Sequence, residues 1–346
     1  HWSFGKRFAR EETLYRQGAR ALAYELVINS DPCINYIMEE NTMTMQALVM
    51  AHASFGHNHF FKNNYLFRQW TDADGILNYL DFAKKYIARC EDRYGHEEVE
   101  EIVDAAHAIM DQGVFRYRRR PRLSDAEKID RIKRRLAHDQ ETFNDLWRTL
   151  PGVDPEEAGA DDGEETEVGD IQLPEENLLY FLEKQSPILE PWQREILRIV
   201  RNISQYFYPQ KQTKVMNEGC ATFVHHYIMH QLHDQGLISD GALMEFLHSH
   251  TSVVFQPDFD DPRYSGINPY ALGFAMMEDI KRVCEDPDEE DRAWFPDIAG
   301  TGAWREVLRD AWANFRDESF ILQYLSPKVM RQFRLFALAD DIETGR

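Results

Sequence analysis

Cysteine is scarce in this 346-residue sequence, and its spacing excludes the sites that cysteines usually build. Cys33, Cys90, Cys220 and Cys284 lie far apart and form no CxxC pair, and they do not suggest the disulfide framework of a small secreted domain. Reduced thiols in a cytoplasmic compartment fit this pattern best. We therefore expect a cytoplasmic protein.

Long apolar runs and an excess of positive charge are also missing. No segment approaches the roughly 20 apolar residues that a membrane-spanning helix needs, so we expect no membrane span. The chain has 39 Lys and Arg residues against 60 Asp and Glu residues, a formal net charge of -21. Because proteins that bind the nucleic-acid backbone present a basic face, we expect no nucleic-acid partner.

Strand-like alternation is rare, and its best example is the segment TSVVF at residues 251–255. Elsewhere apolar residues recur every three or four positions over long stretches, as in residues 14–26, 76–87 and 196–203. This spacing is typical of amphipathic helices. The sequence therefore predicts a mainly α, multi-helix globular fold.

Residues 151–170 contain nine carboxylates, four glycines and no aromatic residue. Such a composition cannot bury enough apolar surface to order itself, so we interpret the segment as a flexible acidic linker or insertion. It would separate an N-terminal helical half, residues 1–150, from a C-terminal helical half, residues 171–346. We expect the two halves to pack around a shared polar centre, because each half contains some of the histidines and glutamates that lie among apolar residues.

The stretch HASFGHNHFFKNN, residues 52–64, brings three histidines together. On a regular helix His52 and His57 point about 140° apart, because each residue advances the helix by about 100°. Gly56 permits the helix to end there, or to bulge by one residue and so turn the spacing of five into an effective four. Two interpretations stay open: metal ligation by His52 and His57, or packing at a helix end.

A second stretch, residues 216–236, places Glu218 and His225 on nearly one helical face with Thr222 between them. A carboxylate that faces a core needs a cation, a metal or several donors. The string NEGxA also resembles the helix that supplies the glutamate ligand in zinc peptidases with an HExxH motif and a distant glutamate. Our leading hypothesis is a divalent-metal site, zinc first, built by His52, His57 and Glu218 in a zincin-like arrangement.

The general base of such a site is not evident. In HExxH the base follows the first histidine, and here Ala53 occupies that position. Glu39, Glu40 and His225 are the candidate catalytic residues, and the sequence does not separate them. A di-iron centre using Glu25, Glu39, Glu40 and Glu218 is a further alternative, although the paired ExxH sequences of such sites are missing.

Further histidines lie in apolar surroundings and are candidates for the polar centre: His107, His248 and His250. Three others, His226, His230 and His233, form an i, i+4, i+7 face. That face lies about 80° or more from the Glu218 stripe and ends beside charged and amide side chains, so we expect it to be solvated.

Several long motifs resemble the stage V sporulation protein R (SpoVR) family. They include HWSFGK, the run from YELVINSDPCINYIMEEN to HFFKNN, NEGCATFVH, MEFLHSHTSVVFQP, YSGINPYALGFAM, WFPDIAG and FRDESFILQYLSPKVMR. The resemblance extends from residue 1 to about residue 336 and omits the acidic segment. These residues fall on the family pattern: His52, Gly56, His57, Lys62, Asn63, His107, Glu218, His225, His248 and His250. Cys220 departs from it, because a tryptophan is usual at that position.

The resemblance implies a bacterial cytoplasmic protein of sporulation or stress response. It also implies a serine protein kinase and a von Willebrand-type protein of the same operon as partners. We expect either a metal-dependent hydrolase acting on peptide or cell-wall-related substrates, or a non-catalytic interaction protein in a kinase-linked stress pathway. The acidic surface would suit a basic partner.

Overall fold

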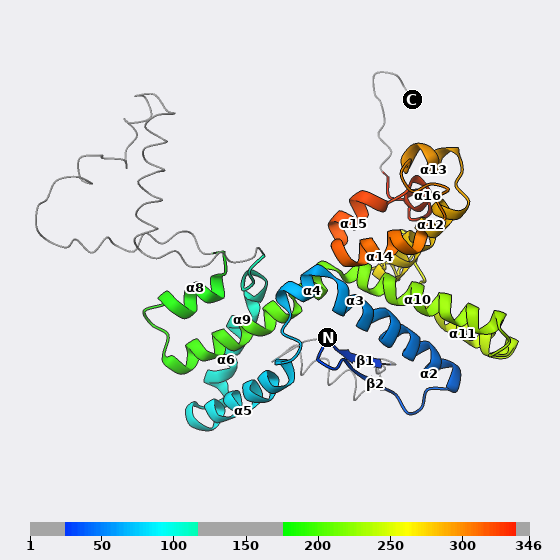
Figure 1. Ribbon diagram of the computed structural model, residues 1–346. Helices are drawn as coiled ribbons and strands as arrows, with labels where there is room; N and C mark the ends of the chain where they lie inside the picture. The colour runs from blue at the N-terminus through cyan, green and yellow to red at the C-terminus, as the bar shows by residue number, and fades with distance from the viewer. Residues whose placement is uncertain (1–24, 117–175, 337–346) are drawn as a thin grey trace, which may run out of the picture. The chain divides into compact units, whose positions relative to one another are not determined.

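The computed structural model describes residues 25–116 and 176–336. Nearly all of the regular structure in these ranges is helical, which confirms the predicted mainly α class (Figure 1). The described strands are β1 (Glu25–Ile28) and β2 (Ile34–Ile37), which pair antiparallel with Glu25 opposite Ile37. None of the helices in the described ranges is both long and apolar enough to cross a membrane.

The chain divides into two compact units, residues 1–114 with 178–346, and residues 115–177. Only the four end residues of the second unit are described, and the described helices and strands all belong to the first. The predicted linker, residues 151–170, and the boundaries expected at its two ends lie outside the described residues.

Helices before and after the undescribed stretch form the first unit. Those before it are α2 (Met43–Met50), the π-helix η1 (Ala51–His57), α3 (Asn58–Asn63), α4 (Tyr65–Trp70), α5 (Ile76–Tyr94), α6 (His96–Ala108) and the 3₁₀ turn η2 (Met110–Gln112). Those after it are α8 (Leu178–Gln185), α9 (Pro191–Gln212), α10 (Lys214–Asp234), α11 (Asp240–Val253), α12 (Pro269–Glu285), α13 (Glu289–Trp294), α14 (Trp304–Asn314), α15 (Asp317–Tyr324) and α16 (Pro327–Gln332).

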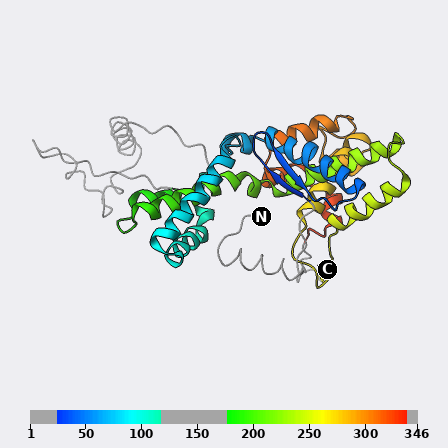
Figure 2. The same ribbon diagram turned by 90° about the horizontal axis from the view of Figure 1, so that it is seen from below.

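Helix α9 packs against α5, α6 and α8 (Figure 2). Val99, Val103 and Ile196 are fully buried in one of the apolar clusters between these helices. A buried carboxylate adds a polar anchor, because Glu183 of α8 forms ion pairs with three basic side chains, Arg198 and Arg201 of α9 and its own neighbour Lys184. This group of helices is held together by both apolar and charged contacts.

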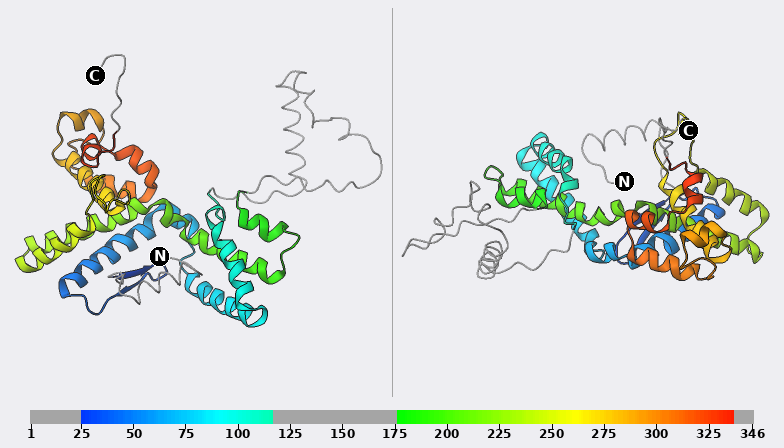
Figure 3. Two further views of the ribbon diagram at one scale, coloured as in Figure 1. Left: turned by 180° about the vertical axis from the view of Figure 1, so that it is seen from behind. Right: turned by 90° about the horizontal axis from the view of Figure 1, so that it is seen from above.

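The largest core surrounds α10, which packs against η1 and against α12 (Figures 1 and 3). The crossing with α12 is a backbone contact, since a Cβ added to Gly219 would lie 2.6 Å from the Cα of Gly273. The first turn of α10 is held by Asp317, whose carboxylate accepts hydrogen bonds from the backbone N–H groups of Val215 and Met216, each at 2.8 Å. The segment that carries Glu218 is therefore fixed on several sides.

The strand-like segment at residues 251–255 is not a strand. It forms the end of α11, which runs to Val253, and the side chain of Asn268 donates to the carbonyl of Val253 at 2.8 Å. Phe246 and His250 are buried on the inner face of the same helix. Tertiary packing of this face therefore outweighs the β-branched composition of a few residues at its end.

Candidate metal centre

Residues Ala51–His57 form a π-helix, and this local geometry brings His52 and His57 together. In a π-helix hydrogen bonds join residues five apart, so residues with that spacing share a face. The two imidazole rings meet edge to face with their centroids 4.6 Å apart, and each residue is only 7% exposed. The bulge that Gly56 permits is thus present.

Gly56 has a second role, which is to let η1 approach α10. A Cβ at this position would lie 2.7 Å from the Cβ of Ala221 and closer still to its Cα. Carbon atoms in contact are about 3.5–4.0 Å apart, so only glycine fits. This close approach places the histidines of η1 beside Glu218 of α10.

Glu218 faces His57 with an unsatisfied carboxylate oxygen. Its Oε2 atom lies 3.6 Å from His57 Nε2 and is buried without a hydrogen-bond partner. One ligand atom from each of His52, His57 and Glu218 falls within 4.8 Å of the others. An orphaned buried oxygen beside two imidazoles is the arrangement expected where a cation is to be held, so this cluster could bind a metal ion.

Asn217 fixes the orientation of His57. The Nδ1 atom of His57 lies 3.0 Å from Oδ1 of Asn217, an acceptor, so Nδ1 carries the proton and donates. The other nitrogen, Nε2, then points its lone pair toward Glu218. Metal-binding histidines usually have such an outer partner, which sets the tautomer and the direction of the ring.

His225 connects the cluster to α11. It is 2% exposed, and it uses both nitrogens: Nδ1 lies 2.8 Å from His52 Nδ1, and Nε2 lies 3.0 Å from His250 Nδ1. A neutral imidazole has one N–H and one lone pair, so His225 donates in one contact and accepts in the other. Both ring nitrogens of His225 are therefore engaged with other histidines.

Burial holds His52 and His225 in the neutral form. Burial lowers the pKa of His52 well below its ordinary value, repulsion from His57 and His225 lowers it further, and a backbone hydrogen bond with Ala221 opposes the shift. Burial, followed by repulsion from His250 and other histidines, lowers the pKa of His225 in the same way. Neutral imidazole is the form that binds metals.

Glu39 and Glu40 do not join the cluster. They are exposed in the turn after β2. The eight residues of α2, which rise roughly 12 Å, separate that turn from η1 and His52. The di-iron alternative loses two of its glutamates for the same reason.

The remaining polar candidates are dispersed. His107, on α6, has its Nδ1 atom 2.8 Å from the carbonyl of Val103. Lys62 donates to the carbonyl of Ser30 at 3.2 Å, and Asn63 donates to the carbonyl of His59 at 2.7 Å. His248 is exposed on α11, whereas His250 is buried and contacts His225. Of these candidates, the structure connects His250 to the cluster through His225.

The expected solvated face of α10 is only partly solvated. His226 and His230 pack against Phe246 of α11, with ring centroids 6.1 and 6.0 Å away, whereas His233 turns outward to Asp240 at 2.8 Å. Phe246 of α11 contacts both of these histidines and Phe274 of α12 contacts His226, so both positions are half-buried. The sequence did not reveal this, because the covering residues come from other helices.

Comparison with known proteins adds a family and a relative. The family model described as SpoVR like protein matches residues 1–345. The uncharacterized protein YcgB of Escherichia coli (strain K12) is 60% identical over 341 residues, which make up 99% of this chain and 66% of the relative. The chain therefore spans just under two-thirds of that relative's length. No solved structure matches the chain.

Proposed function

The chain belongs to the SpoVR family, and we propose that it carries a divalent-metal centre, zinc first, formed by His52, His57 and Glu218. The observation that carries the proposal is the buried, unpartnered Oε2 atom of Glu218, which faces His57 Nε2 at 3.6 Å. We further propose that this diverged zincin-like centre serves a cytoplasmic hydrolase of sporulation or stress response, with peptide or cell-wall-related substrates.

The donor set agrees with zinc chemistry. Two imidazole nitrogens and one carboxylate oxygen are the ligands of several catalytic zinc sites, which keep a fourth position open. Ligand atoms about 2.0–2.1 Å from a tetrahedral ion lie roughly 3.3 Å from each other, close to the 3.6 Å between His57 and Glu218. Zinc held there would supply an activated water, because the cation lowers the pKa of bound water to about 7.

The protein would support this centre with neighbouring side chains. Asn217 holds the tautomer of His57, and Phe61 stacks on the His57 ring with centroids 5.8 Å apart and planes 13° apart. His225 orients His52 from the opposite side. These contacts restrict both rings before any ion arrives, which reduces the ordering cost of metal binding.

A second candidate function follows from the missing general base. Ala53 stands beside His52, Glu39 and Glu40 lie in an exposed turn, and both nitrogens of His225 are engaged. These positions favour a centre that stabilises the fold without catalysis. The protein would then act by binding other proteins, with a serine protein kinase and a von Willebrand-type protein as partners. Its net charge of -21 would favour a partner that presents a basic surface.

Metal analysis of untagged protein tests the proposal. We expect zinc in the purified chain, and we expect His52→Ala and Glu218→Gln each to remove one equivalent. His248→Ala is the matched control, because His248 is an exposed histidine of α11 and its loss should leave the zinc content unchanged. Zinc content that is the same in all four proteins would contradict the metal centre at this cluster.

A second measurement separates the two candidate functions. A hydrolase should release products from peptide or peptidoglycan fragments when loaded with zinc, and Glu218→Gln should abolish the release. An interaction protein should retain binding to the kinase in the same variant. Loss of product release with intact kinase binding supports the hydrolase, whereas kinase binding without any product release in the wild type supports the alternative.

A further inference from the structure

Helix α10 presents a second pair of histidines, His226 and His230, on another part of its surface. The two are four residues apart, the spacing that places side chains next to each other on an α-helix. Their ring centroids are 4.4 Å apart, which is close to the 4.6 Å between His52 and His57. The pair is therefore as compact as the one in η1.

Glu278 of α12 completes a set of two histidines and one glutamate. Its Oε1 atom lies 3.9 Å from His226 Nδ1, too far for a hydrogen bond, just as Glu218 lies 3.6 Å from His57. The Nε2 atom of His230 is buried and has no hydrogen-bond partner. The nearby ammonium group of Lys281 instead forms an ion pair with the Glu285 carboxylate at 2.9 Å. A buried, unpartnered imidazole nitrogen and a partly exposed carboxylate thus lie near His226.

Aromatic rings enclose this second cluster. Phe274 lies 5.0 Å from His226, and Phe246 lies 6.0 Å from His230, measured between ring centroids. His250 packs on His226 at 4.8 Å. Burial, with repulsion from neighbouring histidines, lowers the pKa of His226 to about 3 and that of His250 to about 4. The His226 imidazole is therefore neutral near pH 7 and retains one lone pair.

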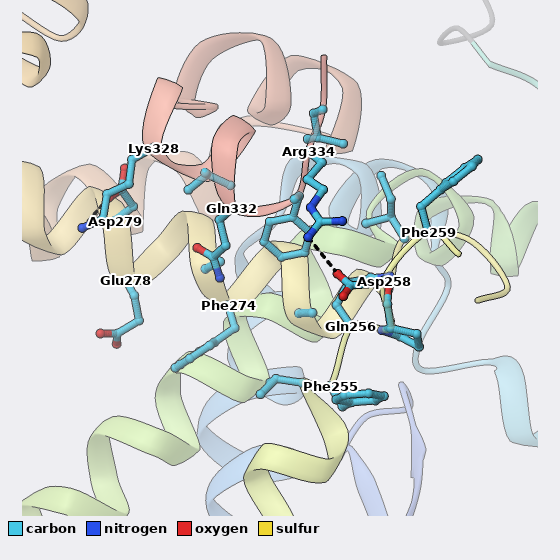
Figure 4. Close-up of a pocket in the computed structure, with 18 of the residues that line it drawn as sticks. Phe255, Gln256, Asp258, Phe259, Phe274, Glu278, Asp279, Lys328, Gln332 and Arg334 are labelled. Carbon is cyan, nitrogen blue, oxygen red and sulfur yellow. Dashed lines mark hydrogen bonds and ion pairs between the residues drawn. The ribbon is translucent and has the colours of Figure 1, made fainter. Parts of the chain in front are cut away.

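One member of the cluster, Glu278, lies on the wall of a cavity. Glu278 and Phe274 lie close together along α12 and line a cavity of about 1200 Å³ between the segment after α11, α12 and the chain around α16 (Figure 4). The ion pair between Asp258 and Arg334, at 3.5 Å, lies elsewhere in the same cavity. The Glu278 side chain is 38% exposed, compared with 17% for Glu218.

We propose that His226, His230 and Glu278 form a second site for a divalent transition-metal ion, separate from the His52–His57–Glu218 cluster, with Glu278 on the wall of the cavity beside α12. Zinc is the ion we expect, because two imidazoles and one carboxylate suit it. Binding requires Glu278 Oε1 and His226 Nδ1 to close from 3.9 Å toward roughly 3.3 Å, and it also requires the His230 ring to turn toward both. Among the described residues, His52, His57 and Glu218 are the set whose ligand atoms already lie within 4.8 Å of one another. This site does not depend on the first one.

Zinc titration of the metal-free, untagged chain tests the second site. We expect two equivalents in the wild type and one in Glu278→Gln, a nearly isosteric change at a partly exposed side chain. His230→Ala should weaken the same equivalent by at least about 100-fold, since even outer-shell changes cost 10- to 100-fold. Circular dichroism checks that both variants fold. His233→Ala is the control, because this histidine lies on the same helix but faces Asp240.

The variants also separate this inference from the first metal centre. One equivalent that disappears in Glu278→Gln and persists in Glu218→Gln supports the second site, even if the first binds nothing. Binding that Glu218→Gln abolishes completely, or that Glu278→Gln and His230→Ala leave unchanged, overturns it. An equivalent lost in His233→Ala would show adventitious surface binding and would also overturn it.

Discussion

Replacing Gly56 with alanine tests whether the contact between η1 and α10 builds the metal centre. The new Cβ would lie 2.7 Å from the Cβ of Ala221, whereas such carbons need about 3.5–4.0 Å. Because the clash also involves the backbone of α10, no side-chain rotation relieves it, and η1 must withdraw by about 1 Å. Overpacking of this kind costs about 1–3 kcal/mol, and the higher helix propensity of alanine returns up to about 1 kcal/mol.

We therefore expect Gly56→Ala to lower the free energy of unfolding by about 2 kcal/mol in urea titrations. The same shift separates both histidines from Glu218, so zinc affinity should fall at least tenfold, since site geometry must hold to about 0.5 Å. Gly241→Ala is the matched control, because its Cβ would meet only Ser239 Oγ at 3.8 Å in α11. It should be neutral or stabilising by up to about 1 kcal/mol. Wild-type stability and zinc affinity in Gly56→Ala would show that the close contact between η1 and α10 does not determine the geometry of this cluster.

Three further outcomes are expected. Asn217→Ala removes the acceptor for His57 Nδ1 and should weaken zinc binding about 10- to 100-fold in calorimetry while circular dichroism stays unchanged; unaltered affinity would contradict the outer-partner role. Burial outweighs three backbone hydrogen bonds and raises the pKa of Asp317 to about 6, so its stabilising contribution is present below about pH 4 and is lost as pH rises through 6. Between pH 4 and 7 the free energy of unfolding in urea should fall by up to about 3 kcal/mol more for the wild type than for Asp317→Asn. If this free energy changes equally with pH in the two proteins, Asp317 does not have the raised pKa. Glu183→Gln leaves three basic side chains without their shared carboxylate and should cost about 3 kcal/mol in thermal or urea unfolding; a neutral result would mean that this buried network contributes no stability.

Local spacing predicted the parts of the structure that depend on neighbours in sequence. Apolar spacings of three and four residues gave the helical class, and the geometry of a five-residue spacing identified Gly56 as the position that decides where His52 and His57 point. The π-helix η1 places residues five apart on one face, so it brings His52 and His57 together through local backbone geometry. The sequence also paired these histidines with Glu218, over 150 residues away.

Features that depend on packing between helices were not accessible in the same way. Glu39 and Glu40 looked suitable as bases by residue type, but the length of α2 separates them from the cluster. The interpretation of residues 251–255 as a strand was wrong, because a few β-branched residues do not outweigh the buried inner face of α11. We expected His226 and His230 to be solvated because only their own helix was visible in the sequence, whereas contacts with α11, and for His226 also with α12, leave them half-buried.

Zinc-edge anomalous diffraction from crystals of untagged protein grown with zinc tests directly whether His52, His57 and Glu218 hold a metal ion. We expect a peak within about 2.0–2.2 Å of one nitrogen each of His52 and His57 and of a carboxylate oxygen of Glu218. An ordered, well-defined cluster of these three side chains with no anomalous peak between them would contradict it.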